Sequence, residues 1–379
     1  MGMKKKILAM ILTLGMAVSL AACGSSGSTG SSAASSAAEE AASAASEAVS
    51  EAAASSAASS AAEETAEAPA EDAGEEAAAP AASGSGTIVF STKTITNNEF
   101  QRIMVEECQK AVEAAGYTFE LTLSGDELAV AKQVEQVENA INRKVDGLII
   151  APMDGSSLIP ALQKAKDAGI PVIIIDASID EGNEDLFLSH VGSNNYAIGY
   201  EAAKQMVDKI GEGKVCTVRG AAGAMGGELR AAGFEAGIKE LGGGKVQLVN
   251  QQNGNWLSDV AMQVTENMLA SDPDMAGIFL CSDGMLSGVI SAVQNRGLNP
   301  ADLCIISVDG NISALDAIKK GDLYGCVAQY PGKEGQISGE IMTQLLSGEI
   351  KEEEVEKETD PGYFFMSPDN IEESESVAY

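Results

Sequence analysis

From Thr87 onward, short apolar and β-branched segments alternate with segments in which apolar residues recur at helical spacing. Several short segments, such as Val172–Ile175, are apolar without interruption, which is typical of strands covered on both faces of a sheet. The pattern predicts ten strands, at residues 87–92, 118–123, 146–152, 170–177, 187–191, 214–219, 246–251, 277–281, 304–309 and 324–330.

Helical patterns occupy the intervening segments. One apolar face contains Phe100, Ile103, Met104, Cys108, Ala111 and Ala115, with Gly116 placed to end the helix. Further helices are predicted with the apolar stripe Val130, Val134, Val137 and Ile141, over residues 196–210, and after Trp256 with Val260, Met262 and Val264 inward. This alternation predicts an α/β fold with parallel sheets and right-handed crossovers.

Ten strands are many for one sheet, so two sheets are predicted, with the division near residues 191–195. Ligand sites of open parallel sheets lie at the carboxyl ends of the strands. If two such sheets face each other, the site lies in the cleft between them.

The N-terminus has the pattern of an export signal. Three lysines, Lys4 to Lys6, precede an apolar run over 7–20 that is too short for a stable membrane-spanning helix. The run ends in Leu20-Ala21-Ala22-Cys23-Gly24, which resembles the lipobox of bacterial lipoproteins. An ordinary signal with a chance cysteine is the alternative. The resemblance implies a signal peptide over 1–23 and lipidation of Cys23, which would hold the protein at the outer face of the cell membrane.

Residues 24–86 consist almost entirely of Ala, Ser, Glu and Gly, with eleven acidic residues and no basic one. Such a segment has too little apolar surface to form a core, which predicts a disordered linker. The whole chain carries a formal charge of −32, which argues against a nucleic-acid partner.

Beyond Cys23, five cysteines lie scattered in apolar runs without a CxxC pair: Cys108, Cys216, Cys281, Cys304 and Cys326. Buried hydrophobic roles are predicted, and a disulfide between two of them stays open. No metal site is expected, because His190 is the only histidine and an isolated histidine is more often structural.

The body resembles the periplasmic binding proteins of the ribose/galactose type, the solute receptors of ABC importers. The resemblance covers residues 87–379 and rests on the order of several short motifs. These are Phe90-Ser91-Thr92, Asn97-Asn98-Glu99-Phe100, the run 146–152, Gly169-Ile170-Pro171-Val172-Ile173 leading to Asp176, Val191-Gly192-Ser193-Asn194-Asn195, Gly233-Phe234, Ser282-Asp283, Val308-Asp309-Gly310 and Ala328-Gln329-Tyr330-Pro331.

The resemblance implies two Rossmann-like lobes joined by a three-segment hinge, the type I periplasmic binding protein fold. The crossings would fall near Ser193, residues 329–330 and Asp360. The N-terminal lobe would then contain 87–192 plus 330–359, and the C-terminal lobe 193–329 plus 360–379. The protein is expected to be a monomer and to need no cofactor.

Two carboxylates, Asp176 and Asp309, follow buried strands and so lie where a ligand site is expected. Turn or cap aspartates are the alternative reading. The resemblance adds Arg230, which relatives place at the start of a helix, and Trp256 as a ring that stacks on a sugar, with core packing as its rival. It also adds Phe100, Asn98, Gln329 and, more weakly, Ser91.

Three positions depart from the ribose pattern: Ala177 stands where an arginine is common, Gln101 where an aromatic residue is, and Ser282 where an asparagine is. These departures argue against a pentose. Trp256 favours a six-membered ring, and inositol or a modified sugar stays open. Asp283 could cap the helix that begins at Gly284 or reach the ligand, and the cap is the favoured prediction.

Enzyme motifs are absent from the sequence: there is neither a GxxxxGK[ST] loop nor a G-x-S-x-G elbow. The sequence therefore favours a lipid-anchored, exported receptor that captures a monosaccharide or polyol and presents it to an ABC permease and its ATPase. The alternatives are a sensor subunit for a membrane kinase or chemoreceptor, which would take a sugar or furanose-like signal, and a carbohydrate-active enzyme. The export signal and the lack of a basic helix-turn-helix argue against a repressor.

Overall fold

The computed structural model describes residues 84–96 and 98–379. The predicted signal peptide, Cys23 and the linker as far as residue 83 lie outside the described residues. Gly84 and Gly86, which the sequence analysis assigned to the linker, hydrogen-bond to Ala115 and Thr118 at backbone distances of 3.2 and 2.9 Å. In the described residues, no helix has both the length and the apolar character needed to span a bilayer.

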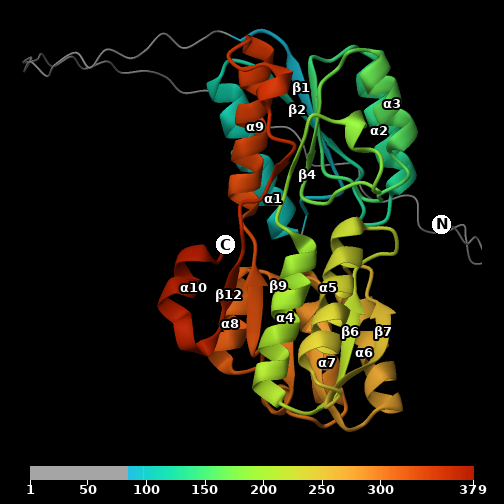
Figure 1. Cartoon of the computed structure of the whole chain (residues 1–379), viewed down its shortest axis with the longest axis vertical. Helices are drawn as coiled ribbons and strands as arrows, with labels where there is room; N and C mark the ends of the chain where they lie inside the picture. The colour runs from blue at the N-terminus through green and yellow to red at the C-terminus, as the bar shows by residue number, and fades with distance from the viewer. Residues whose placement is uncertain (1–83, 97) are drawn as a thin grey trace, which may run out of the picture. The chain divides into compact units, whose positions relative to one another are not determined.

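The first sheet has the strand order β11-β5-β4-β3-β1-β2, and all of its strand pairs are parallel. Figure 1 shows it with helices on both sides. Its strands are β1 (Thr87–Thr92), β2 (Thr118–Leu123), β3 (Gly147–Ile150), β4 (Val172–Ile175), β5 (Ser189–Val191) and β11 (Glu358–Thr359), and its helices are α1 (Glu99–Ala114), α2 (Val130–Asn142), α3 (Ile159–Asp167) and α9 (Pro331–Ser347).

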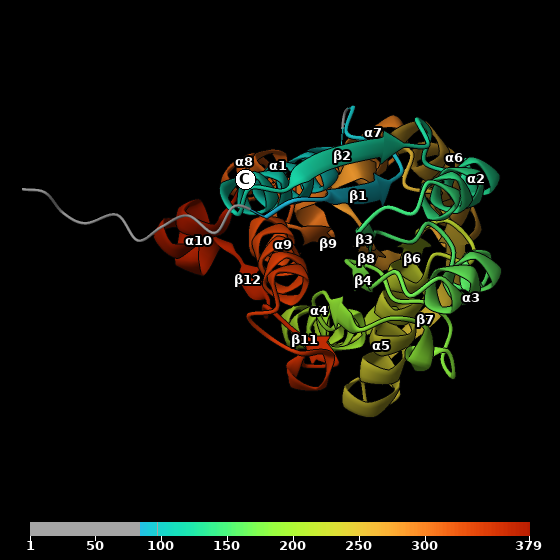
Figure 2. The ribbon, with the colours of Figure 1, turned by 90° about the horizontal axis from the view of Figure 1, so that it is seen from above.

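Alternate residues of these strands enter two separate cores. Ile88, Phe90 and Ile149 pack with α1 and α9, whereas Val89 and Leu148 pack with α2 and α3. The view from above shows these two helix pairs on opposite sides of the sheet (Figure 2). Covering both faces explains why the strands read as continuous apolar runs.

The second sheet has the order β12-β10-β9-β8-β6-β7 and is parallel except for the antiparallel pair β10 and β12. Its strands are β6 (Gly213–Arg219), β7 (Val246–Asn253), β8 (Met275–Leu280), β9 (Cys304–Asp309), β10 (Gly325–Ala328) and β12 (Phe364–Met366), and its helices are α4 (Asn195–Ile210), α5 (Met225–Leu241), α6 (Ser258–Ser271), α7 (Leu286–Asn295), α8 (Ile312–Lys320) and α10 (Ile371–Val377). Short 3₁₀ turns lie at Glu184–Leu186, Asp283–Met285, Pro300–Asp302, Glu352–Glu354 and Pro368–Asn370.

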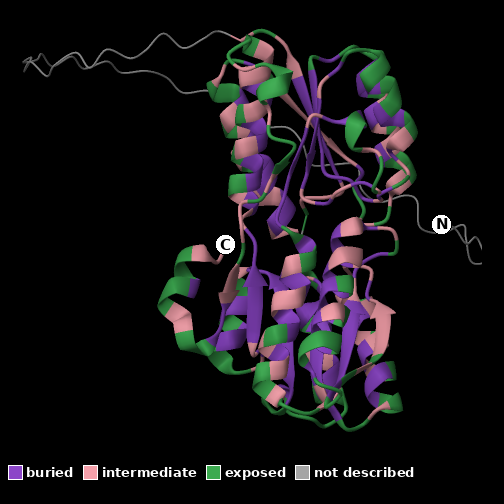
Figure 3. Cartoon of the chain, in the orientation of Figure 1, coloured by how far each residue is buried: buried purple, intermediate pink, exposed green. Residues whose placement is uncertain are grey.

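The chain passes between the two sheets three times. The passages follow β5, β10 and β11, since β6 and β12 belong to the second sheet while α9 packs on the first. Burial is concentrated in the strands and the inward faces of the helices (Figure 3). The two α/β bodies of the predicted fold class are therefore present.

The predicted elements match the structure closely at some positions and less well at others. The strands over 87–92, 118–123 and 304–309 have the predicted bounds, whereas β3, β4 and β10 are shorter than predicted. The short strands β11 and β12 were not predicted. The inner face of α6 was predicted only in part: its buried residues are Ala261, Thr265, Met268 and Leu269, whereas of the predicted residues Val264 packs, partly buried, against the core. The helix begins at Ser258, and this register turns the predicted residues partly outward.

Close packing of α1 against α9 depends on a glycine. A Cβ atom added to Gly335 would lie 2.0 Å from the carbonyl oxygen of Met104, a backbone atom that cannot move aside. We expect Gly335→Ala to lower the free energy of unfolding by about 1–3 kcal/mol, the usual cost of overpacking. Urea denaturation of the purified protein measures this change.

Gly332→Ala, on the same helix, is the matched control. Its nearest heavy atom would be 3.4 Å away, in a flexible glutamate side chain, so stability should not fall. Equal destabilisation by both substitutions would contradict the close-approach argument.

Candidate functional site

A cavity lies where the carboxyl ends of the two sheets' parallel strands meet. Its walls come from the loops after β1, β2, β3, β4, β6, β7 and β8, from the end of β9, and from the start of α1 and the first two turns of α5. The lining residues are Thr92, Lys93, Asn98, Phe100, Gln101, Glu127, Ala151, Pro152, Met153, Asp176, Ala177, Ala224, Gly226, Arg230, Trp256, Ser282 and Asp309. The space that water centres can reach is about 60 Å³, room for about five waters. The cavity thus suits one small molecule.

Three predicted site residues have a strained backbone. Asp176, Trp256 and Asp309 have φ angles of 67°, 64° and 118°, in the left-handed region that side-chain-bearing residues avoid. Each such residue costs on the order of 1–3 kcal/mol, and such strain is concentrated at functional sites. The strain therefore supports the choice of these residues independently of the sequence patterns.

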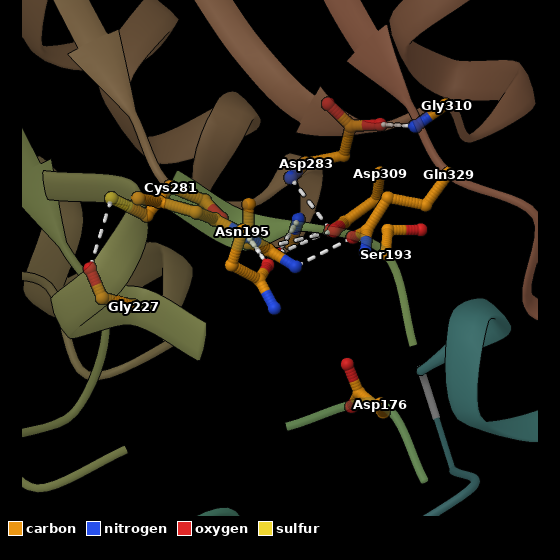
Figure 4. Close-up of polar contacts among 12 residues, drawn as sticks. Asp176, Ser193, Asn195, Gly227, Cys281, Asp283, Asp309, Gly310 and Gln329 are labelled. Carbon is orange, nitrogen blue, oxygen red and sulfur yellow. Dashed lines mark hydrogen bonds and ion pairs between the residues drawn. The ribbon is translucent and has the colours of Figure 1, made fainter. Parts of the chain in front are cut away.

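Arg230 is the centre of the hydrogen bonding on the second-sheet side. The residue is buried, with 4% of its surface exposed. Nε donates to Asn195 (2.7 Å), Nη1 to the carbonyl of Cys281 (2.6 Å) and to Asp309 Oδ1 (3.3 Å), and Nη2 to Gln329 (2.5 Å). Figure 4 shows Asn195, Asp309 and Gln329 converging in this way. Arg230 lies in the second turn of α5 rather than at its first residue.

Asp309 accepts two further hydrogen bonds, from Ser282 Oγ at 2.6 Å and from the backbone N–H of Asp283 at 3.1 Å. Burial raises the pKa of Asp309, and the nearby charge of Arg230 opposes the rise. Its carboxylate is thus held in one orientation at the cavity wall.

The prediction that Asp283 caps the following helix is wrong. Ser282 is the cap, since its hydroxyl accepts from Gly284 N at 3.1 Å. The carboxylate of Asp283 turns the other way and accepts from the backbone N–H groups of Gly310 and Asn311, both at 2.8 Å. Burial and the charge of Asp309 raise the pKa of Asp283 to about 7.

Gln101 orders the first-sheet side of the cavity. Its Nε2 donates to Asp176 Oδ2 at 2.9 Å, and its Oε1 accepts from the hydroxyl of Thr92. Because Gln101 is 1% exposed, this amide acts as a fixed support for the Asp176 carboxylate. The sequence analysis treated Gln101 only as a missing aromatic ring.

A second polar group lies across from Trp256. Lys93 Nζ forms an ion pair with Glu127 at 2.8 Å, and Asn98 Nδ2 donates to Glu127 at 2.9 Å. Lys93 Nζ also lies 5.2 Å from the centroid of the Trp256 ring. The side-chain oxygen Oδ1 of Asn98 caps α1 by accepting from Gln101 N.

Sequence reasoning missed Lys93 and Glu127. Lys93 directly follows the first predicted strand, so the strand-end rule that found Asp176 could have found it. Glu127 lies farther along the loop that follows β2, so the same rule points to its loop without singling out the residue.

Six of the eight predicted ligand-binding residues line the cavity: Asn98, Phe100, Asp176, Arg230, Trp256 and Asp309. Ser91 and Gln329 do not, and both are fully buried behind the wall. Gln329 supports Arg230 from that position. His190, which the sequence analysis left out of the site, lies outside the cavity wall, with its ring nitrogens 2.7 Å from Glu358 and 3.2 Å from the carbonyl of Asp176.

Glu334, at the start of α9, is fully buried beside the crossings between the sheets. Its Oε1 accepts from the backbone N–H and the hydroxyl of Ser193, at 3.2 and 3.0 Å. The same hydroxyl lies 3.1 Å from the carbonyl of Gly362. Burial, and next the charge of Asp176, raise the pKa of Glu334 well above its usual range.

The described cysteines and acidic residues do not suggest metal or thiol chemistry. All five cysteines from Cys108 to Cys326 are buried and unpaired, as predicted for small hydrophobic residues. Burial raises the pKa of Cys216, Cys281 and Cys304 to about 12, which keeps the thiols protonated and unreactive. Over 84–96 and 98–379, no group of three or more His, Cys, Asp or Glu side chains could hold a metal ion.

The arrangement can bind a small polar ring. Carboxylates, an amide, a hydroxyl and an arginine give paired donors and acceptors around a tryptophan ring, and such groups recognise hydroxyls by position.

Comparisons with known proteins agree with this geometry. Residues 88–350 match the family model described as the periplasmic binding protein domain. The ribose import binding protein of Bacillus subtilis is 33% identical over 219 residues, which cover 58% of this chain and 68% of that protein. The D-ribose/D-allose-binding protein of Pseudomonas aeruginosa is 29% identical, over 68% of this chain and 81% of its own length.

Solved structures of solute binding proteins are also similar to this chain. An ABC transporter solute binding protein from Agrobacterium vitis with bound D-fucose is 32% identical, with a TM-score of 0.71, and covers 78% of this chain and 100% of its own. A periplasmic solute binding protein from Actinobacillus succinogenes with bound D-allose is 28% identical, with a TM-score of 0.67, over 76% and 99% of the two chains.

The raised pKa of Asp283 predicts a pH dependence of stability. Between its ordinary value of 3.8 and about 7, the folded state binds more protons than the unfolded state. The contribution of Asp283 to the free energy of unfolding is therefore greatest at low pH and is lost as the pH rises toward 7. We expect Asp283→Asn, which keeps an acceptor oxygen, to show a smaller drop in urea midpoint between about pH 5 and about pH 8 than the wild type.

The same change at the exposed Asp302 is the control and should leave the wild-type pH dependence intact. Parallel curves for the wild type and Asp283→Asn would exclude Asp283 as the group responsible.

Proposed function

This chain belongs to the periplasmic binding protein family, and on that premise we propose that it captures a monosaccharide or related polyol and delivers it to an ABC transporter permease. Membership makes it a binding protein rather than an enzyme. The relatives named above bind or import ribose, allose or fucose, which supports a small sugar or polyol as the ligand class.

One observation carries the proposal: the strained carboxylates Asp176 and Asp309 face one small cavity from different sheets. A small hydroxylated ring held between them would donate hydrogen bonds to both carboxylates. The strain and the burial lower the stability of the folded protein at this position. Residues that contact a ligand commonly retain such unfavourable geometry. Asn98, Phe100, Arg230 and Trp256 complete the proposed ligand contacts, whereas Ser91 and Gln329 would act from behind.

Closure around the ligand follows from the chain path. We take 87–192 with 330–359 as one lobe and 193–329 with 360–379 as the other, with the three crossings as the hinge. A ligand that bonds to both lobes stabilises the closed arrangement over the open one, and the permease would recognise the closed state. A backbone hydrogen bond beside the cavity, from Gly155 N to Gly223 O at 3.0 Å, joins the two proposed lobes.

Membrane attachment is a separate part of the proposal. The motif ending at Cys23 supports export, cleavage and lipidation at the outer face of the cell membrane, with residues 24–83 as spacer. The receptor would then stay next to its permease while the folded body captures the ligand.

The ligand-binding role is tested by thermal shift, because a ligand that prefers the folded state raises the melting temperature. With D-ribose, D-allose, D-fucose and myo-inositol as probes, we expect at least one to stabilise the wild type. Asp309→Ala should abolish that shift, and Asp176→Ala should reduce it strongly.

Lys351→Ala is the control, since Lys351 is exposed and far from the cavity wall, and it should keep the full shift. If Asp309→Ala is too unstable to test because Arg230 is left unpaired, Asp176→Ala decides the question at a partly exposed position. An unchanged shift in Asp176→Ala would contradict the proposed site.

The lipid anchor is tested by Cys23→Ser. We expect the wild type, made in a bacterial host with labelled palmitate, to carry the label and to sediment with membranes. Cys23→Ser should lose both, because no thiol remains for acylation. Label retained by the variant would show that the attachment lies elsewhere.

A further inference from the structure

The cations at the cavity wall already have anionic partners. Lys93 pairs with Glu127 at 2.8 Å, and the two side chains are only 18% and 12% exposed. Arg230 pairs with Asp309, and their side chains are 5% and 9% exposed. These two pairs are close to neutral, so neither leaves a free charge for the ligand.

Asp176 is different. Its carboxylate receives the neutral amide of Gln101 on Oδ2, and no described lysine or arginine forms an ion pair with it. Figure 4 shows Asp176 set apart from the Asp309 cluster, across the open space between them. The adjacent wall residue, Ala177, brings neither a charge nor a donor side chain.

The described surroundings supply no cation that would offset the charge of Asp176. Asp283 and Glu334 lie buried behind the wall, and their oxygens accept from N–H and hydroxyl groups rather than from cations. Burial raises the pKa of Glu334 most, and the charge of Asp176 is the next largest cause. The charge of Asp176 therefore acts on a buried group with which it forms no hydrogen bond.

We propose that this site selects its ligand by charge: it accepts a neutral or amine-bearing polyhydroxylated ring, prefers an amine placed at Asp176, and excludes rings that carry a carboxylate or phosphate. This inference rests on the proposed sugar-binding function and narrows its substrate class. A protonated amine would supply the cation that Asp176 lacks. An acidic substituent would bring a like charge into a desolvated site, which is strongly unfavourable.

The chain contains its own reporter for the test. Trp256 is the only tryptophan and lines the cavity, so quenching or enhancement of its fluorescence follows occupancy. The probes are two matched series: D-galactose, D-galactosamine and D-galacturonate, and D-glucose, D-glucosamine and D-glucuronate. In the series that binds, we expect the amine to bind about tenfold more tightly than the neutral sugar and the acid about tenfold more weakly, as for a hydrogen bond to a charged group.

Asp176→Asn should bring the three affinities within about threefold of one another, because it removes the charge and keeps the shape. Glu120→Gln removes one negative charge at an exposed ion pair with Arg143, outside the cavity, and should leave the wild-type order unchanged. An acid that binds as tightly as its neutral parent overturns the charge inference alone, as does an amine preference that persists in Asp176→Asn. Failure of all six probes to bind overturns the charge inference; the proposed function is decided separately, by the thermal shift with D-ribose, D-allose, D-fucose and myo-inositol.

Discussion

The buried guanidinium of Arg230 is the interaction on which the rest of the site depends. A desolvated charge must be matched by partners, and removal of one partner of a buried pair commonly costs about 3–5 kcal/mol. Here the partners come from α4, from the ends of β8 and β9, and from the residue after β10. One side chain thus fixes four segments of the chain that are distant in sequence, and it holds Asp309 in its strained conformation.

The crossings between the sheets are tied together by a similar arrangement. Glu334, just beyond the second crossing, accepts twice from Ser193 in the first, and the Ser193 hydroxyl also reaches the carbonyl of Gly362 in the third. Gln329, which supports Arg230, lies at the second crossing. The cavity and the crossings therefore share neighbouring hydrogen bonds.

The cavity is costly to maintain. It combines backbone strain at three residues with carboxylates that burial drives toward the protonated form, at Asp283, Asp309 and Glu334. Backbone N–H groups of Gly310 and Asn311 offset part of this cost for Asp283. Sites of this kind sacrifice stability for a prearranged set of hydrogen-bonding groups, which reduces the ordering needed when a ligand binds.

The sequence by itself determined the α/β class and most strand positions, because continuous apolar runs such as Val172–Ile175 occur only where both faces of a strand are covered. It also located Asp176 and Asp309, since carboxyl ends of parallel strands share one edge. Only the tertiary structure decided that Gln101 supports Asp176, that Lys93 pairs with Glu127, and that Asp283 turns toward Gly310. These contacts join residues 75, 34 and 27 positions apart. Local periodicity does not predict these contacts. The direction of a polar side chain is set by the partner that the folded chain brings within hydrogen-bonding distance.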